Sequence, residues 1–297
     1  MHRTVDPEVV GSSPIVLAIW GPFERTAPVF LDVTMDNVLN MVWLAVLQGV
    51  TEFLPVSSSG HLVLLQKLLG VEAPGETVEV VLHVGTMLSI LAYYRKTIVR
   101  LVAGVFKGDA AAWRMVLCIG LSAVPAVFFY FLCKDRIDAF YENAKAVGGF
   151  LLFTGFVLMA LRWIPGGKGN VTPARAVLIG IAQSIAILPG VSRSGMTIAS
   201  ARMSGVSPDE AAEFSFLMCL PLLAGAAVLS LLGHTSGAEG ASVTEVFPAW
   251  VLATGCLLSA AVGYAALALL VRLLRGGRFW MFGLYCAAVG LVILLRM

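Results

Sequence analysis

The sequence predicts an all-α polytopic membrane protein with six transmembrane helices and two re-entrant helical hairpins in an inverted-topology repeat. Composition is the first observation: 59% of the 297 residues are hydrophobic and only 13% are charged, which is more apolar and less charged than an ordinary soluble domain. The other two observations are the lengths of the apolar stretches and the presence of one polar motif in two copies. Together they indicate a duplicated fold inside a membrane.

The amino-terminal stretch, residues 1–34, contains prolines, mixed charges and an apolar patch that is too short to cross a bilayer. We expect this extension to have no function, and Met35 is a candidate for the true translation start. Residues 35–297 are expected to form a single membrane domain, with repeat one at about 35–163 and repeat two at about 174–297.

Six apolar stretches are close to the length of about 20 residues that a helix needs to cross a bilayer. The first contains Glu79 and His83 and is therefore the least regular. All five cysteines lie inside apolar runs without a Cys-x-x-Cys pair, so we interpret them as small hydrophobic residues of membrane helices. The six predicted spans are residues 78–94, 113–133, 146–163, 210–232, 247–271 and 279–295.

The charges of the connecting loops predict which side of the membrane each loop occupies. Basic residues dominate the loops at 95–114, 162–175 and 272–278, so the positive-inside tendency places these loops in the cytoplasm. The acidic loop at 234–246 and the mixed loop at 134–145 are then outside. Each polar motif must therefore begin and end on one side, and we interpret both as re-entrant hairpins entering from opposite faces. Full crossings by one or both motifs, up to eight in total, are the competing topology.

The two polar motifs share one plan. The first is QGVTEFLPVSSSGH at residues 48–61, and the second is GIAQSIAILPGVSRSGMT at residues 180–197. Each has Gly-x-x-Glu or Gly-x-x-Gln, then a proline, then Val-Ser-x-Ser-Gly. The proline interrupts the first helix, and a new apolar helical segment follows the serines. Because broken helices of inverted repeats meet near the membrane midplane, we expect the two turns to face each other.

The two turns predict an anion site. Backbone outside a helix is tolerated at membrane depth only beside protein or a water-filled cavity, so a polar cavity is expected here. Serines near helix amino termini, where free N–H groups and partial positive charge gather, favour an anion and phosphate in particular. Arg193 adds a permanent cation whose planar donors suit bidentate phosphate contact.

Gln48 and Glu52 are four residues apart and therefore share one helix face. A carboxylate inside a membrane is costly unless it has a cation, water or a partner. Magnesium and calcium bind carboxylate oxygens together with phosphate oxygens, so a divalent cation, Mg²⁺ or Ca²⁺, is expected at Glu52 with a carbonyl oxygen from Gln48. A purely structural ion pair between Glu52 and Arg193 is the alternative.

The first motif also contains a candidate nucleophile. Ser58 can attack phosphorus once a base removes its proton, although spacing alone does not choose among Ser57, Ser58 and Ser59. His61 lies three residues after Ser58, near enough for acid or base work, and a structural hydrogen bond is its alternative role. His83 is a weaker candidate.

These motifs resemble those of the bacterial undecaprenyl-pyrophosphate phosphatase family, the bacitracin-resistance type. The resemblance rests on Gln-x-x-x-Glu followed by PVSSSGH and on the later PGVSRSGMT, which match the family patterns Glu or Gln-x-x-x-Glu and Pro-Gly-x-Ser-Arg-Ser-x-x-Thr. It extends from about residue 35 to the carboxyl terminus. The family implies removal of the terminal phosphate from undecaprenyl pyrophosphate in the bacterial inner membrane, which regenerates the lipid carrier of cell-wall synthesis.

The resemblance also implies roles for the matching positions. Glu52 and Gln48 would have a metal or acid-base role. Ser58 would be the nucleophile, Arg193 would hold the pyrophosphate, and the role of the matching His61 stays open. Because Gln48 stands where many relatives have glutamate, Glu52 must carry more of the carboxylate chemistry. Hydrogen bonds to phosphate would come from Ser57, Ser59, Ser192, Ser194 and Thr197.

Two other function classes are compatible with parts of the pattern. A lipid-carrier flippase or other transporter is the stronger alternative, because inverted repeats with broken helices are a transporter architecture. An intramembrane serine protease is weaker, since it has no use for Arg193 beside a carboxylate. The net charge of +2 gives no indication of nucleic acid. We expect a polyprenyl pyrophosphate and membrane lipids as partners, and the sequence allows a homodimer.

Overall fold

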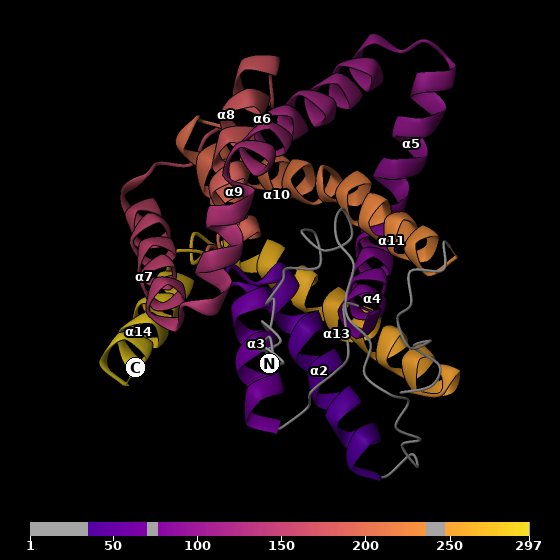
Figure 1. Ribbon diagram of the computed structural model, residues 1–297. Helices are drawn as coiled ribbons and strands as arrows, with labels where there is room; N and C mark the ends of the chain where they lie inside the picture. The colour runs from indigo at the N-terminus through magenta and orange to yellow at the C-terminus, as the bar shows by residue number, and fades with distance from the viewer. Residues whose placement is uncertain (1–34, 70–76, 236–246, 297) are drawn as a thin grey trace, which may run out of the picture.

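The computed structural model describes residues 35–69, 77–235 and 247–296 (Figure 1). Within these ranges every regular element is helical, apart from one isolated β-bridge. The all-α prediction is therefore confirmed for the described residues. The predicted extension at 1–34 lies outside them.

Three of the described helical stretches are long and apolar enough to cross a membrane, at Ala110–Cys133, Ala144–Trp163 and Ala249–Arg275. Several other apolar helices are shorter. The chain is thus helical with multiple membrane-length segments. In chain order the elements are α2 (Met35–Phe53), α3 (Ser58–Leu69), α4 (Thr77–Tyr93), α5 (Arg95–Phe106), α6 (Ala110–Glu142), α7 (Ala144–Ala160), the 3₁₀ turn η1 (Leu161–Trp163), α8 (Pro173–Ile185), α9 (Arg193–Met203), α10 (Pro208–Leu217), α11 (Cys219–Thr235), α13 (Ala249–Arg275) and α14 (Met281–Arg296).

The stretch at 210–232, predicted as one helix, is divided between two. Helix α10 ends at Leu217 and α11 begins at Cys219, with a turn at Met218 between them. Pro221 explains the break, because it lacks the N–H that would bond to the Leu217 carbonyl and its ring clashes with that carbonyl in a continuous helix. The break leaves Cys219 at the start of a new helix.

Helices α2 and α3 form one hairpin, and α8 and α9 form another. In Figure 1, α2 and α3 occupy the lower half of the molecule and α8 the upper part, so the two hairpins extend toward opposite ends. The base of the second hairpin is closed by hydrogen bonds from the Gly169 N–H to the Gly205 carbonyl at 3.0 Å and from the Ser207 N–H to the Gly169 carbonyl at 2.9 Å. The two ends of this hairpin therefore lie side by side.

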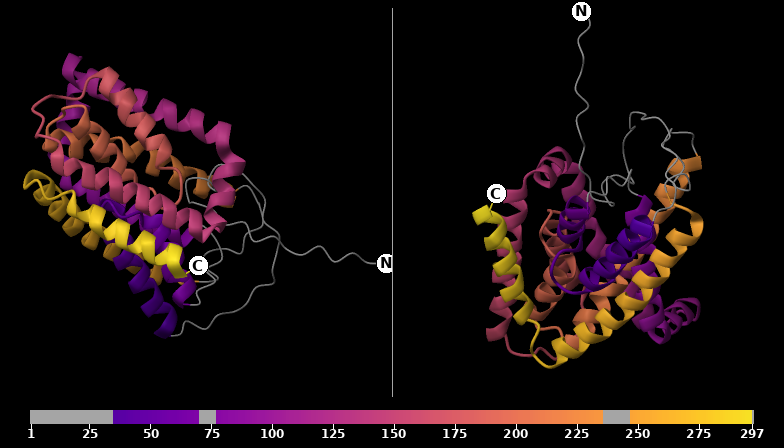
Figure 2. Two further views of the ribbon diagram at one scale, coloured as in Figure 1. Left: turned by 90° about the vertical axis from the view of Figure 1, so that its left-hand side faces the viewer. Right: turned by 90° about the horizontal axis from the view of Figure 1, so that it is seen from below.

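Each hairpin is supported by a closely packed pair of helices. Figure 2 shows α14 running alongside α7, which also contacts α9. A Cβ on Gly155 of α7 would lie 2.9 Å from the backbone oxygen of Gly283 in α14, so only glycine permits this approach. On the other side of the molecule, α13 packs against both α2 and α4. The positions of the hairpin tips are fixed by these pairs.

The main buried core lies where α2, α10 and α13 meet, and includes Phe53, Phe214 and Leu270. The outer surface is also apolar, with Phe128 and Trp163 among the large hydrophobic side chains that are mostly exposed. An apolar exterior of this extent suits contact with lipid. Together with the membrane-length helices, it indicates a multi-pass membrane protein.

Candidate active site

The first hairpin turns at the sequence PVSSSGH. Ser57 has a left-handed backbone with a φ of 69°, which is uncommon for a residue other than glycine and persists only where its surroundings impose it. The Ser57 carbonyl accepts hydrogen bonds from the His61 N–H at 3.3 Å and from His61 Nδ1 at 2.8 Å. These bonds stabilise the beginning of α3, and Ser58 is the first residue of that helix.

The second hairpin turns at PGVSRSG, where Gly190 has a φ of 93° and a Cβ would lie 2.5 Å from a backbone oxygen of α7. Thr154 of α7 fixes this turn, because its hydroxyl donates to the Gly190 carbonyl at 3.2 Å and accepts from the Ser192 N–H at 3.3 Å. Ser192 in turn caps α9, its Oγ accepting from the Gly195 N–H at 3.1 Å. Arg193 is therefore the first residue of α9.

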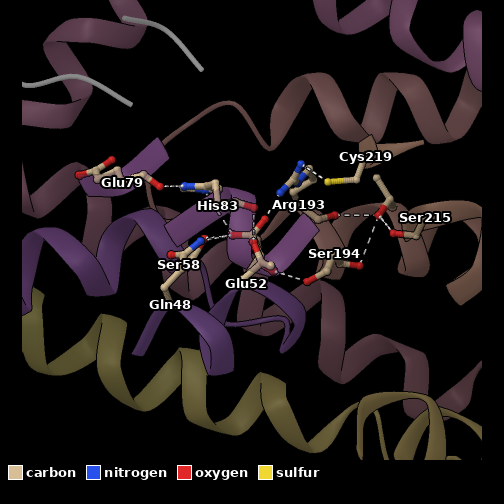
Figure 3. A network of polar contacts seen from close by, with 12 residues as sticks. Gln48, Glu52, Ser58, Glu79, His83, Arg193, Ser194, Ser215 and Cys219 are labelled. Atoms are coloured by element: carbon tan, nitrogen blue, oxygen red, sulfur yellow. Dashed lines mark hydrogen bonds and ion pairs between the residues drawn. The ribbon is translucent and has the colours of Figure 1, made fainter. Parts of the chain in front are cut away.

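Glu52 is the centre of a polar cluster that joins the two turns (Figure 3). Its buried carboxylate accepts at Oε2 from the Ser58 hydroxyl at 2.8 Å and from Gln48 Nε2 at 3.2 Å. Its Oε1 accepts from Arg193 Nη2. The first hairpin thus supplies a carboxylate and a hydroxyl, and the second supplies the balancing cation. Ser58 is at the distance from a carboxylate base that proton transfer requires.

Arg193 is held from two sides. Besides its contact with Glu52, its Nη1 donates to Cys219 Sγ at 2.6 Å. Cys219 reaches this position because the helix breaks at Met218. Removing one partner of a buried ion pair costs about 3–5 kcal/mol, since the other charge is left uncompensated. An anion entering the cavity would compete with Glu52 for the guanidinium donors.

His83 of α4 lies on another side of Glu52, as Figure 3 shows. Its Nε2 is 3.6 Å from Glu52 Oε2, and its Nδ1 is 2.7 Å from the Glu79 carbonyl oxygen. Because a carbonyl only accepts hydrogen bonds, Nδ1 carries a proton in this arrangement. His83, a weaker candidate than His61 in the sequence, thus belongs to the polar cluster around Glu52.

The cluster opens into a cavity of about 150 Å³. One wall of the cavity is apolar and comes chiefly from α6, with Ala126, Val127, Tyr130 and Phe131. A site with one polar and one apolar wall suits an amphipathic ligand that has an anionic head and a hydrocarbon tail. The polar lining residues are Thr51, Glu52, Ser57, Ser58, Ser59, Glu79, His83, Gln183, Ser192 and Arg193.

Most of the residues predicted for the site meet here, although they come from two distant motifs, with Glu52 and Arg193 separated by 141 positions in the sequence. Gln48 reaches the cavity through its hydrogen bond to Glu52. The predicted residues that line the cavity or contact Glu52 are Gln48, Glu52, Ser57, Ser58, Ser59, Ser192 and Arg193.

The other three predicted residues neither line this cavity nor form a hydrogen bond to Glu52. His61 Nε2 is 2.7 Å from the Tyr285 hydroxyl of α14, and the two rings stack with their centroids 5.7 Å apart. Thr197 Oγ1 is 2.5 Å from Ser215 Oγ. Ser194 lines a smaller pocket that also includes Glu52 and Arg193, and its Oγ is 3.3 Å from Ser192 Oγ. His61 and Thr197 are thus placed to support the two turns from the outside, whereas Ser194 lies beside the Glu52–Arg193 pair.

Several residues of the site were not among those predicted from the sequence, and two of them, Gln183 and Cys219, are instructive. Gln183 lines the cavity, and its correspondence to Glu52 in the repeated motif was a signal that could have identified it. Cys219 contacts Arg193, but a cysteine within an apolar run carries no such signal. Its role depends on the break between α10 and α11, which only the structure shows.

The polar wall also fits a divalent cation. Within the described ranges, no group of three or more His, Cys, Asp or Glu side chains is placed to hold a metal. Gln48 Oε1, however, is buried beside the Glu52 carboxylate and has no hydrogen-bond partner in the described part of the chain. One carboxylate and one amide oxygen are suitable protein ligands for Mg²⁺ or Ca²⁺ when phosphate oxygens and water complete the coordination.

Comparison with known proteins places the whole membrane region in one family. A family model described as bacitracin resistance protein BacA matches residues 41–292. An undecaprenyl-diphosphatase of Desulfosudis oleivorans is 38% identical, over 86% of this chain and 97% of its own length. Proteins of the same name from Halothermothrix orenii and Korarchaeum cryptofilum are 33% and 34% identical, over 87% and 84% of this chain and 98% and 96% of their own lengths. With this match over nearly all of the described residues, the chain belongs to the bacitracin resistance protein BacA family.

Proposed function

We propose that this protein is an integral-membrane lipid pyrophosphatase that hydrolyses undecaprenyl pyrophosphate to undecaprenyl phosphate and inorganic phosphate. The observation that carries the proposal is the meeting of the Ser58 hydroxyl, the Glu52 carboxylate and the Arg193 guanidinium in one cavity whose other wall is apolar. A pyrophosphate lipid needs a polar wall for its anionic head and an apolar wall for its hydrocarbon chain. The relatives named undecaprenyl-diphosphatase support the same activity.

Ser58 is the proposed nucleophile. Its proton passes to Glu52 Oε2, which lies 2.8 Å away, while Oγ forms a bond to the terminal phosphorus. The bond from that phosphorus to the bridging oxygen breaks, so undecaprenyl phosphate leaves and a phosphoseryl group remains. Gln48 holds the accepting oxygen in place through its own hydrogen bond at 3.2 Å.

Arg193 is the proposed pyrophosphate clamp. Its planar donors can exchange the Glu52 carboxylate for phosphate oxygens, and its position at the amino terminus of α9 adds free backbone N–H groups. Stabilisation of charge is the main catalytic contribution in phosphoryl transfer. Ser57, Ser59 and Ser192 line the same cavity and are proposed to donate hydrogen bonds to phosphate.

Glu52 and Gln48 are the residues that would hold a divalent cation, either Mg²⁺ or Ca²⁺. When bound, such an ion neutralises phosphate charge and polarises a phosphoryl oxygen. We expect a chelator to abolish phosphate release and added Mg²⁺ or Ca²⁺ to restore it. Full activity in the presence of excess chelator would exclude the ion.

We also propose six crossings with two re-entrant hairpins, as an inverted repeat of residues 35–163 and 174–297, in the bacterial inner membrane. The closed base of the α8–α9 hairpin and the opposite directions of the two hairpins support this topology. Cysteines introduced at positions 66–69 and 204–208 are expected to react with impermeant reagents from opposite faces. Labelling of both from one face would contradict the inverted arrangement.

Phosphate release from undecaprenyl pyrophosphate in detergent, with Mg²⁺ present, tests the function. Detergent removes the two sides between which a transporter moves its substrate, so a flippase without phosphatase activity releases no phosphate. We expect the wild type to release phosphate and to carry phosphate trapped on Ser58 after an acid quench. Ser58→Ala should release none. An active Ser58→Ala protein would mean that water attacks the pyrophosphate directly.

A further inference from the structure

We infer that Gln183 orients the water that hydrolyses the phosphoseryl group, an inference that rests on the proposed function. Gln183 belongs to α8, is only 3% exposed, and lines the same cavity as Ser58 and Arg193. Its Oε1 has no hydrogen-bond partner within the described ranges. A buried carbonyl without a donor costs about 1–3 kcal/mol. A carbonyl retained at that cost inside a reaction cavity is placed to accept a hydrogen bond from a ligand.

The position of Gln183 is fixed by its helix. A Cβ on Gly180, one turn earlier, would lie 2.4 Å from the backbone oxygen of Ser122, so α8 is pressed against α6. The hydroxyl of the neighbouring Ser184 donates a hydrogen bond to the Gly180 carbonyl at 2.9 Å, within α8 itself. Gln183 is thus held on a rigid element with its amide at the cavity.

The repeated motif explains why this carbonyl is left without a protein donor. By position, Gln183 corresponds to Glu52, and Arg193 corresponds to Ser58. Arg193 reaches across to Glu52, so the counterpart of that contact would join Ser58 to Gln183. Serine is much shorter than arginine, and the Ser58 hydroxyl instead donates to Glu52 at 2.8 Å. Ser58 and Gln183 both line the cavity, so cavity space takes the place of that counterpart contact.

Phosphoryl chemistry assigns an occupant to that space. In the first step the lipid phosphate leaves from the side of phosphorus opposite Ser58 Oγ, and in the second step water must attack from that same side. Water then needs an acceptor beyond the phosphorus as seen from Ser58. An amide carbonyl accepts such a hydrogen bond, and glutamine orients the attacking water in other phosphoryl-transfer enzymes.

The second step balances with the groups present. The water oxygen forms a bond to phosphorus while the bond from phosphorus to Ser58 Oγ breaks. Oγ takes back the proton that Glu52 received in the first step. Both water protons leave with the product as dihydrogen phosphate, so Gln183 orients the water without exchanging a proton.

The test compares Gln183→Leu with wild type and with Ser184→Ala, a neighbouring buried residue that does not line the cavity. With labelled undecaprenyl pyrophosphate, we expect Gln183→Leu to lower kcat for phosphate release about 10²-fold and to accumulate phosphoserine after an acid quench. KM should fall in parallel, so that kcat/KM stays nearly unchanged, because only the second step is slowed. Ser184→Ala should match the wild type. Gln183→Met, which has similar length but no amide, should repeat the result if the leucine variant does not fold.

Gln183→Glu supplies a rescue, because its side chain keeps an accepting oxygen and should accumulate less phosphoserine than Gln183→Leu. The inference is overturned if Gln183→Leu and Gln183→Met keep the wild-type kcat, if KM alone rises, or if kcat falls without accumulation of phosphoserine. Failure of the wild type to release any phosphate would overturn the proposed function instead, so the two failures are distinguishable.

Discussion

The two hairpin turns follow the same sequence plan but are stabilised in different ways. In the first turn, Ser57 has a left-handed conformation and its carbonyl is bonded to His61 of the same motif, while α14 contacts the turn through Cys286, whose Sγ donates to the Pro55 carbonyl at 3.2 Å. The second turn depends on a neighbouring helix, because Thr154 of α7 bonds to both Gly190 and Ser192. Two turns with one sequence plan therefore bring different chemical groups to the same site. One turn carries the proposed base and the proposed nucleophile, and the other carries the cation.

Replacing the carboxylate of the first turn should have the largest effect. Glu52→Gln removes the proton acceptor of Ser58 and leaves Arg193 without its counter-charge, so we expect phosphate release to fall about 10⁴-fold. The initial rate in detergent measures this. Glu213→Gln is a matched control, since Glu213 bonds to Thr97 and lies outside the cavity lining. A rate within about tenfold of wild type would contradict the proposed base.

The cation of the second turn should come next. Arg193→Lys keeps the charge but loses the planar pair of donors, and we expect a fall in kcat of about 10²–10³-fold. Arg202→Lys on the same helix provides the control, because Arg202 bonds to the Val206 carbonyl away from the cavity. Equal activity of both lysine variants would show that charge alone suffices at position 193.

The dependence of the second turn on α7 predicts a loss of stability with a smaller effect on rate. Thr154→Val removes the hydroxyl that serves both Gly190 and Ser192, and we expect a destabilisation of about 1–3 kcal/mol. Thermal unfolding in detergent should show a lower Tm. Thr254→Val, which loses only a bond to its own helix, should leave Tm nearly unchanged, and an equal fall in both variants would refute the special role of Thr154.

The smallest predicted effect separates two serines at equivalent positions. Ser192→Ala removes the cap of α9 and should cost about 1 kcal/mol. Ser57→Ala should change stability by less than about 0.5 kcal/mol, because Ser57 Oγ has no hydrogen-bond partner in the described part of the chain. Equal Tm values for the two variants would show that the turns are stabilised alike.

The sequence predicted the meeting of the two motifs because helix breakers and polar residues recur at matching offsets in both. It also singled out Glu52 and Arg193, since each is a costly charged group in an apolar chain, whereas the choice of Ser58 among three serines came from the family resemblance. The position of His83 beside Glu52 could not be predicted, because spacing does not say which face of α4 turns toward Glu52. The contact of Cys219 with Arg193 could not be predicted, since it requires the break that Pro221 introduces into an apolar segment.

The Glu52 and Arg193 pair has a consequence for biogenesis. Glu52 belongs to the first hairpin and Arg193 to the second, so each of these buried charges lacks its partner until the two hairpins meet. Either charge alone has a high free-energy cost inside a bilayer, whereas the ion pair has no net charge. The two hairpins therefore complement one another electrically while the nascent chain is assembled. Single neutralising variants should accumulate poorly in cells, and the double variant Glu52→Gln with Arg193→Gln should accumulate well yet remain inactive.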